Sequence, residues 1–106
     1  MSINLSQTAE CSTELTATMT GAFTLIGILL FNPVIIIFDN QGTVPVAIST
    51  DGVTTWRTFP AGEALVLDMR GNHGNAPNFT FSVGTSFYGD GASGTFSISY
   101  VYAKIV

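Results

Sequence analysis

The chain has 106 residues, a net charge of −4 and 9% charged residues, although 46% of its residues are hydrophobic. Soluble domains typically carry about 25% charged residues, so this deficit predicts a surface that other protein covers in large part. Three lysine and arginine residues in total cannot form a basic face, which argues against direct binding to nucleic acid. The length allows one domain and no separate catalytic domain.

Residues 1–12 are polar, and we expect them to form an N-terminal arm that only a partner orders. The opening sequence, MSINLSQTAE, lacks the basic start and early apolar run of a secretion signal. Cys11 is the single cysteine, so it cannot form a disulfide within the chain or build a zinc site alone. This usage fits a protein made in a reducing cytosol.

After this arm, turn residues recur about every ten positions and no helical period persists. We therefore expect residues 13–106 to form one all-β domain. Its architecture is expected to be a single antiparallel, jelly-roll-like β-sandwich of seven or eight strands. The first strand is expected at residues 13–19, where threonines favour extended structure.

Residues 21–38 form an apolar run that approaches the length of a membrane span. Asn32 and Pro33 interrupt the run, no Lys or Arg flanks it, and its second half is β-branched. We expect two buried strands there, at residues 23–30 and 34–38, and no membrane association. A small membrane-active protein built on this run is the alternative, which a helical circular dichroism spectrum in detergent would favour.

The next strand, at residues 44–49, is expected to end in a two-residue hairpin at Asp51 and Gly52. A type I′ turn needs positive φ at both central residues, which Asp-Gly supplies. In that hairpin Ala47 faces Trp56, a small side chain beneath a large ring. The residues expected to shape turns are Asp51, Gly52, Pro60 and Gly62.

Strands at residues 63–69 and 79–83 are expected next, on either side of a polar loop that contains His73. The inward row of the second of these strands is expected to be Phe79, Phe81 and Val83. The last strand, at residues 95–102, alternates apolar and polar residues strictly, as a half-buried antiparallel strand does.

Two groups of apolar and aromatic residues are candidates for protein–protein contacts. The first lies in the apolar run, and the second lies beside the glycine-rich turn at residues 89–94, where aromatic side chains are expected to be exposed. The candidate interface residues are Phe23, Leu25, Ile28, Leu30, Phe87 and Tyr88.

One interpretation of this region is a carbohydrate or other ligand site, in which the Trp56 ring would stack on the ligand and Asp51 and Arg57 would hold it by polar contacts. Trp56 and Arg57 are neighbours on one strand, so their side chains should point to opposite faces. We therefore expect a structural turn and a core tryptophan.

No other motif points to chemistry. His73 lacks the nucleophile or second acid–base group that catalysis needs. Residues 39–42 and 89–94 supply no more than one carboxylate each, too few for calcium. We expect no catalytic residues, no metal, no cofactor and no enzyme.

The order of strands and turns over residues 32–104 resembles a recurring type of small structural protein in tailed bacteriophage particles. The positions that carry the resemblance are Asn40, Ser49, Asp51, Gly52, Pro60, Ala61, Gly62, Asp68, Asn72, Ser93, Gly94, Ser97, Tyr102 and Ala103. The chain departs from this pattern where Thr54 and Thr55 replace an acid and where the loop carries His73.

The resemblance implies a non-enzymatic structural protein of a tailed-phage virion, assembled in the host cytoplasm. Its expected partners are copies of itself and other virion proteins at the head–tail or tail region. One alternative is a capsid decoration (cement) protein. Another is a carbohydrate-binding, receptor-contacting module, which would need Trp56 and some of Phe87, Tyr88 and Tyr100 on one exposed face.

Overall fold

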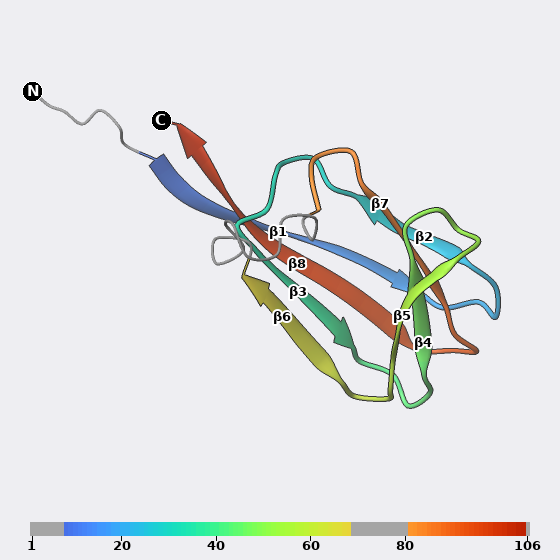
Figure 1. Ribbon diagram of the computed structural model, residues 1–106. Helices are drawn as coiled ribbons and strands as arrows, with labels where there is room; N and C mark the ends of the chain where they lie inside the picture. The colour runs from blue at the N-terminus through green and yellow to red at the C-terminus, as the bar shows by residue number, and fades with distance from the viewer. Residues whose placement is uncertain (1–7, 69–80, 106) are drawn as a thin grey trace, which may run out of the picture.

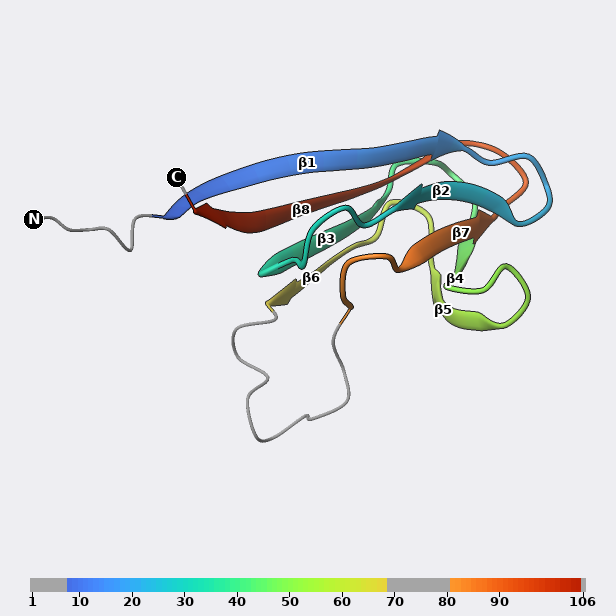
Figure 2. The same ribbon diagram turned by 90° about the horizontal axis from the view of Figure 1, so that it is seen from above.

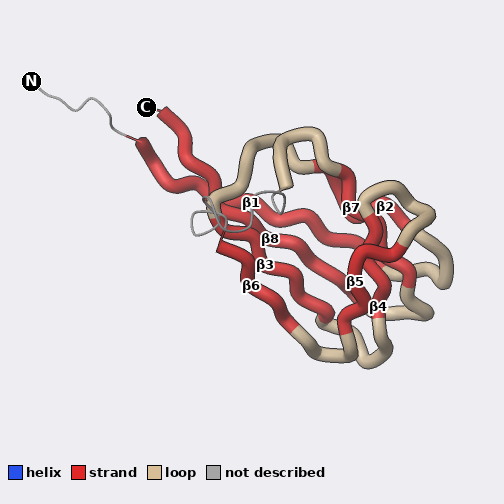
Figure 3. Tube along the Cα trace, viewed as in Figure 1, coloured by secondary structure: helices blue, strands red, loops and turns tan. Residues whose placement is uncertain are grey.

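The computed structural model describes residues 8–68 and 81–105, and these residues form two antiparallel four-stranded sheets (Figure 1). No helix occurs in these two segments (Figure 3), so none can cross a membrane. The strands are β1 (Thr8–Thr18), β2 (Thr24–Ile28), β3 (Ile35–Asn40), β4 (Val46–Ser49), β5 (Thr55–Phe59), β6 (Ala64–Asp68), β7 (Ser86–Asp90) and β8 (Thr95–Ile105). The all-β sandwich expected from the sequence is confirmed.

The strand orders are β1-β8-β3-β6 in one sheet and β2-β7-β4-β5 in the other. Along the chain, every step from one strand to the next crosses to the opposite sheet, except the step from β4 to β5. This alternation is the jelly-roll arrangement of two facing sheets. Figure 2 shows the two layers, with β1 and β8 running along the first and β2 and β7 beneath them.

Strands β1 and β8 form a ladder that is longer than the rest of their sheet. They pair over eleven residues each, from Thr8 opposite Ile105 to Thr18 opposite Thr95. Strand β3 pairs with β8 only as far as Val101. The first residues of β1 and the last of β8 therefore project from the sandwich as a two-stranded ribbon (Figure 1). The N-terminal arm was expected at residues 1–12, and of these Thr8 to Ser12 lie in β1.

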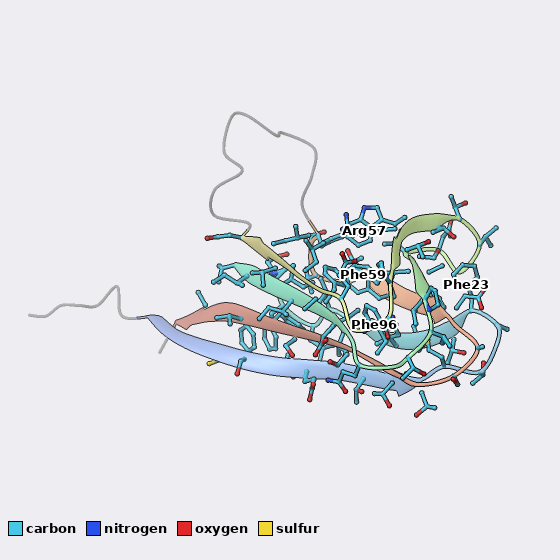
Figure 4. The ribbon with its side chains drawn as sticks, turned by 90° about the horizontal axis from the view of Figure 1, so that it is seen from below. Phe23, Arg57, Phe59 and Phe96 are labelled. Atoms are coloured by element: carbon cyan, nitrogen blue, oxygen red, sulfur yellow. The ribbon has the colours of Figure 1, made fainter. Side chains whose placement is uncertain are left out.

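Alternate residues of the strands point between the sheets and build an aromatic core. The ring of Phe38 lies 5.6 Å from Phe59, 5.5 Å from Phe87 and 5.3 Å from Trp56. Figure 4 shows Phe59 and Phe96 between the sheets, with Phe23 farther along, towards the loops. Offset and edge-on ring pairs of this kind stabilise a core beyond the area that they bury.

A buried amide holds the turn after β3 against the corner after β5. Asn40 donates from Nδ2 to the carbonyl oxygens of Val44 at 2.9 Å, Phe59 at 3.1 Å and Pro60 at 3.1 Å. Its Oδ1 accepts from the backbone nitrogen of Gly42 at 3.0 Å. Asn40 is fully buried, so its amide needs these partners to satisfy its own hydrogen-bonding groups.

The expected strand at residues 79–83 is wrong over its described part, because residues 81–85 precede β7 in a turn. Thr85 donates its backbone N–H to Ser82 at 3.0 Å, and Gly84 has a φ of 92°. Positive φ at Gly84 fits glycine and interrupts the extended chain. Phe81 still packs on the core, 5.1 Å from Phe87, whereas Val83 is exposed and not part of an inward row. Residues 79 and 80 lie outside the described segments.

The two-residue hairpin expected at Asp51 and Gly52 is also wrong. Ser49 pairs with Thr55, and Ala47 pairs with Thr58 instead of Trp56. Side chains make the wider turn, since Asp51 Oδ1 accepts from the backbone nitrogens of Val53 at 2.8 Å and Thr54 at 2.7 Å. Ser49 Oγ accepts from the backbone nitrogens of Asp51 and Gly52. Asp51 and Gly52 remain turn residues, and Gly52 and Gly62 both have positive φ.

We predict that Asn40→Ala lowers the free energy of unfolding by about 2–3 kcal/mol, because it removes four hydrogen bonds, one of them buried, and leaves a small cavity. Chemical denaturation measures this change. Thr43→Ala, an exposed position in the same turn, is the control and should change stability by less than about 0.5 kcal/mol. Equal effects of the two substitutions would contradict the role of the amide.

The hydrogen bonds from Thr54 and Val53, and then from Ser49, lower the pKa of Asp51 from 3.8 to about 2. A depressed folded-state pKa contributes stability above the unfolded value, which is lost as the pH falls through the folded value. We predict that Asp51→Asn unfolds at a lower temperature than wild type at pH 7. The gap between the two midpoints should narrow between pH 3.8 and about pH 2. A gap that stays constant down to pH 2 would contradict this assignment.

Candidate assembly surface

In the described part of the chain, no three His, Cys, Asp or Glu side chains gather as metal ligands would, and no pocket opens. His73 lies outside the described residues. The remaining candidate features of the described residues are exposed apolar side chains and the edge strands of the two sheets.

Trp56 and Arg57 do not point to opposite faces as expected. Strand β5 has a bulge, since Ile48 pairs with Arg57 while its neighbour Ser49 pairs with Thr55. A bulge places an extra residue opposite the partner strand and redirects its side chain. Arg57 lies over the Phe59 ring at 5.2 Å (Figure 4), and the Trp56 ring lies 6.2 Å from the same ring.

This arrangement is structural. The Trp56 ring packs edge-on against Phe81 at 5.3 Å, as well as against Phe38 and Phe59. Arg57 Nη2 lies 3.9 Å from Glu63 Oε1 across the margin of the sandwich. Trp56 is a half-buried residue that packs against the core, as expected.

Exposed apolar side chains gather on another part of the molecule. Seven large apolar residues are exposed in the described segments, and five of them lie on β2, on the loop after it, or on the turn before β7. These five, which we call the flank patch, are Leu25, Ile28, Leu30, Phe31 and Val83. Contiguous exposed apolar surface commonly marks an interaction site.

Backbone hydrogen bonds hold the two parts of the flank patch together. Leu29 donates to the Thr85 carbonyl at 2.9 Å and accepts from the Gly84 nitrogen at 2.8 Å. Asn32 Oδ1 accepts from the Val83 nitrogen at 2.7 Å. The side chain of Leu29 is fully buried and anchors the loop. The exposed neighbours on either side of Leu29 are thus presented by a fixed backbone.

The same loop is tied to β8. The backbone nitrogen of Leu30 donates to Tyr100 Oη at 3.0 Å, and the Phe31 ring stacks on Tyr102 at 3.9 Å with an interplanar angle of 5°. Desolvation raises the pKa of Tyr102, and the neighbouring Cys11 adds to the rise. A preformed apolar surface loses little conformational entropy when a partner covers it.

Strand β2, which carries Leu25 and Ile28 of the flank patch, lies next to β1. A Cβ atom built on Gly27 of β2 would come within 2.8 Å of the Leu15 side chain of β1, so the two strands are in close contact. Figure 2 shows β2 directly beneath β1. Between Cys11 and Val34, Glu14 is the only charged residue in the sequence. An apolar strip and an unpaired strand edge therefore form one nearly uncharged flank.

Residues 23–30 were expected to form a buried strand, but Leu25, Ile28 and Leu30 are exposed. Of the other candidate interface residues, Phe23 and Tyr88 are half-buried. Phe87 was expected to be exposed and is fully buried in the core, because it lies on the inward face of β7. Sequence reasoning missed Phe31 and Val83. Phe31 ends the apolar run and could have been included, whereas Val83 was assigned to an inward row.

No family model and no curated protein matches the chain. Among solved structures, the chain is similar to a protein from Bacillus endospore appendages, which are described as a novel family of disulfide-linked pili. The identity is 18%, the TM-score is 0.48, and the match covers 98% of this chain and 96% of that chain.

The expected role in a tailed-phage virion is corrected by this finding, because the structure found belongs to a spore appendage and not to a phage. The correction applies to the expected head–tail role and to the capsid-decoration and receptor-binding alternatives. For the receptor-binding alternative the geometry points the same way, since Trp56 and Phe87 lie in the aromatic core instead of on one exposed face.

Proposed function

We propose that the chain is a non-enzymatic structural subunit that associates with copies of itself through the flank patch. The observation that carries this proposal is the concentration of exposed apolar side chains beside an unpaired strand edge. The low charge content of the whole sequence supports this proposal, because few charged side chains are present to repel neighbouring copies. The Trp56 and Asp51 regions contribute structure to the subunit.

The size of the surface is compatible with a specific contact. A small specific interface buries about 1,200 Å² in total, which is about 600 Å² from each partner. The chain exposes 5826 Å², so such a contact would cover roughly a tenth of it. Apolar area buried there contributes about 25 cal/mol per Å² before the cost of association is subtracted. Glu10 and Glu14 are the only charged residues between Thr8 and Val34 in the sequence, so few charged groups lose their hydration in such a contact.

We predict that Leu30→Asp raises the dissociation constant of self-association by about tenfold or more, since it removes an apolar contact and buries a charge. Leu30 is 67% exposed, so the fold should tolerate the substitution. Sedimentation velocity over a concentration series measures the association.

Val53→Asp is the matched control, because Val53 is 79% exposed but lies in the β4–β5 turn. It should associate as wild type does. A wild-type chain that stays monomeric at all concentrations, or equal weakening by both substitutions, would contradict the proposed function.

A further inference from the structure

We propose that β1 of one copy pairs with β1 of a second copy, antiparallel and centred on Thr13. The two four-stranded sheets would then join into one continuous sheet of eight strands. The contact is isologous, so the same strand serves both partners and a closed two-fold dimer results. This inference rests on the self-association proposed above and specifies how it occurs.

Strand β1 lacks most of the features that protect the other strand edges. Natural edge strands avoid unwanted pairing by being short, by bulges, by proline, or by charged side chains, lysine above all. The charged residues of β1 are Glu10 and Glu14. Strand β2 has five residues and a register shift, β5 has five residues and a bulge, and β6 has five residues. Strand β1 has eleven residues in unbroken register with β8 and contains no proline or lysine. Among the strands that the structure describes, none pairs with the other side of β1.

The sequence of β1, TAECSTELTAT, reads similarly in both directions from its centre, so it can pair with a reversed copy of itself. With Thr13 on the two-fold axis, the numbers of any two opposite residues add up to 26. The pairs across the seam are Thr8 with Thr18, Ala9 with Ala17, Glu10 with Thr16, Cys11 with Leu15, Ser12 with Glu14, and Thr13 with Thr13. Apolar residues thus meet apolar residues, and polar residues meet polar ones.

The face of each residue is preserved in this register. Within one chain Leu15 and Ala17 lie opposite Ile98 and Phe96 of β8, on the core side of the sheet. Directly opposite residues of antiparallel strands share a face. Because the sum of 26 pairs odd positions with odd ones, the core sides of both copies lie on the same side of the joined sheet.

The charges on β1 allow this pairing. No two glutamates lie directly opposite each other, because Glu14 faces Ser12 and Glu10 faces Thr16 of the second copy. The two Glu14 residues are diagonal neighbours, about 7–8 Å apart across the seam, and each Glu14 is also the diagonal neighbour of Glu10 of the second copy. A register shifted to a sum of 28 would place Glu14 directly opposite Glu14, and like charges in that position are destabilising.

The pairing also brings β2 towards the second copy. Strand β2 runs beneath β1 (Figure 2), and Gly27 lies against Leu15. When the β1 strands pair, the two β2 edges approach each other from either side of the axis. Strand β2 carries Leu25 and Ile28 of the flank patch, and burial of these exposed side chains would add to the backbone pairing.

Charge substitutions at Ser12 test the register, since Ser12 is exposed and faces Glu14 of the second copy only in this arrangement. Ser12→Lys should lower the dissociation constant about fivefold, and Ser12→Glu should raise it about fivefold, because the symmetric dimer contains each pair twice. In the Glu14→Gln chain the two substitutions should lose this difference. Thr58→Lys and Thr58→Glu, on the β5 edge, are the controls and should be equivalent.

If the wild type associates but Lys and Glu at position 12 act alike, the β1 pairing is overturned while self-association stands. The β1 pairing is also overturned if the dissociation constants of Thr58→Lys and Thr58→Glu differ by more than those of the two Ser12 variants, since the β5 edge would then form the contact. A wild-type chain that remains monomeric overturns both the pairing and the proposed function.

Discussion

A sandwich of two open sheets has unpaired backbone groups along the edges of its sheets, and the way in which these edges are protected determines where this chain can associate. Each free edge presents N–H and C=O groups that can pair with another chain. Strands β2, β5 and β6 are short, and two of them are also bulged, whereas β1 is long and regular. It lies next to β2, which carries Leu25 and Ile28 of the flank patch. The edge and the patch together form the surface on which self-association is proposed.

The interior of the sandwich fixes this surface in place. Phe38 brings the rings of both sheets together, and Asn40 ties the turns at one end through four hydrogen bonds. On the flank itself, Tyr100 and Tyr102 of β8 hold the loop that presents Leu30 and Phe31. The core side of β8 is therefore continuous with the contacts that position the exposed residues.

The fold class could be predicted because strand alternation and turn residues are local signals. The closing strand and the two strands within residues 21–38 follow directly from them. The errors arose where side chains override the local pattern. Ser49 and Asp51 widen a turn that Asp-Gly alone predicts to be tight, and a bulge redirects Trp56. The exposure of Val83 and the burial of Phe87 depend on the start of β7, which Gly84 shifts along the chain. The free edge of β1 follows from sheet order, which no local pattern encodes.

Amide hydrogen–deuterium exchange of the wild-type chain, compared between dilute and concentrated solution, tests the central claim most directly. Association through the β1 edge predicts that exchange slows with concentration in peptides from residues 8–18 and 24–31. Peptides that cover the β5 and β6 edges should exchange at the same rate in both solutions. Exchange that is independent of concentration in residues 8–18, or slowing confined to β5 or β6, would contradict the account.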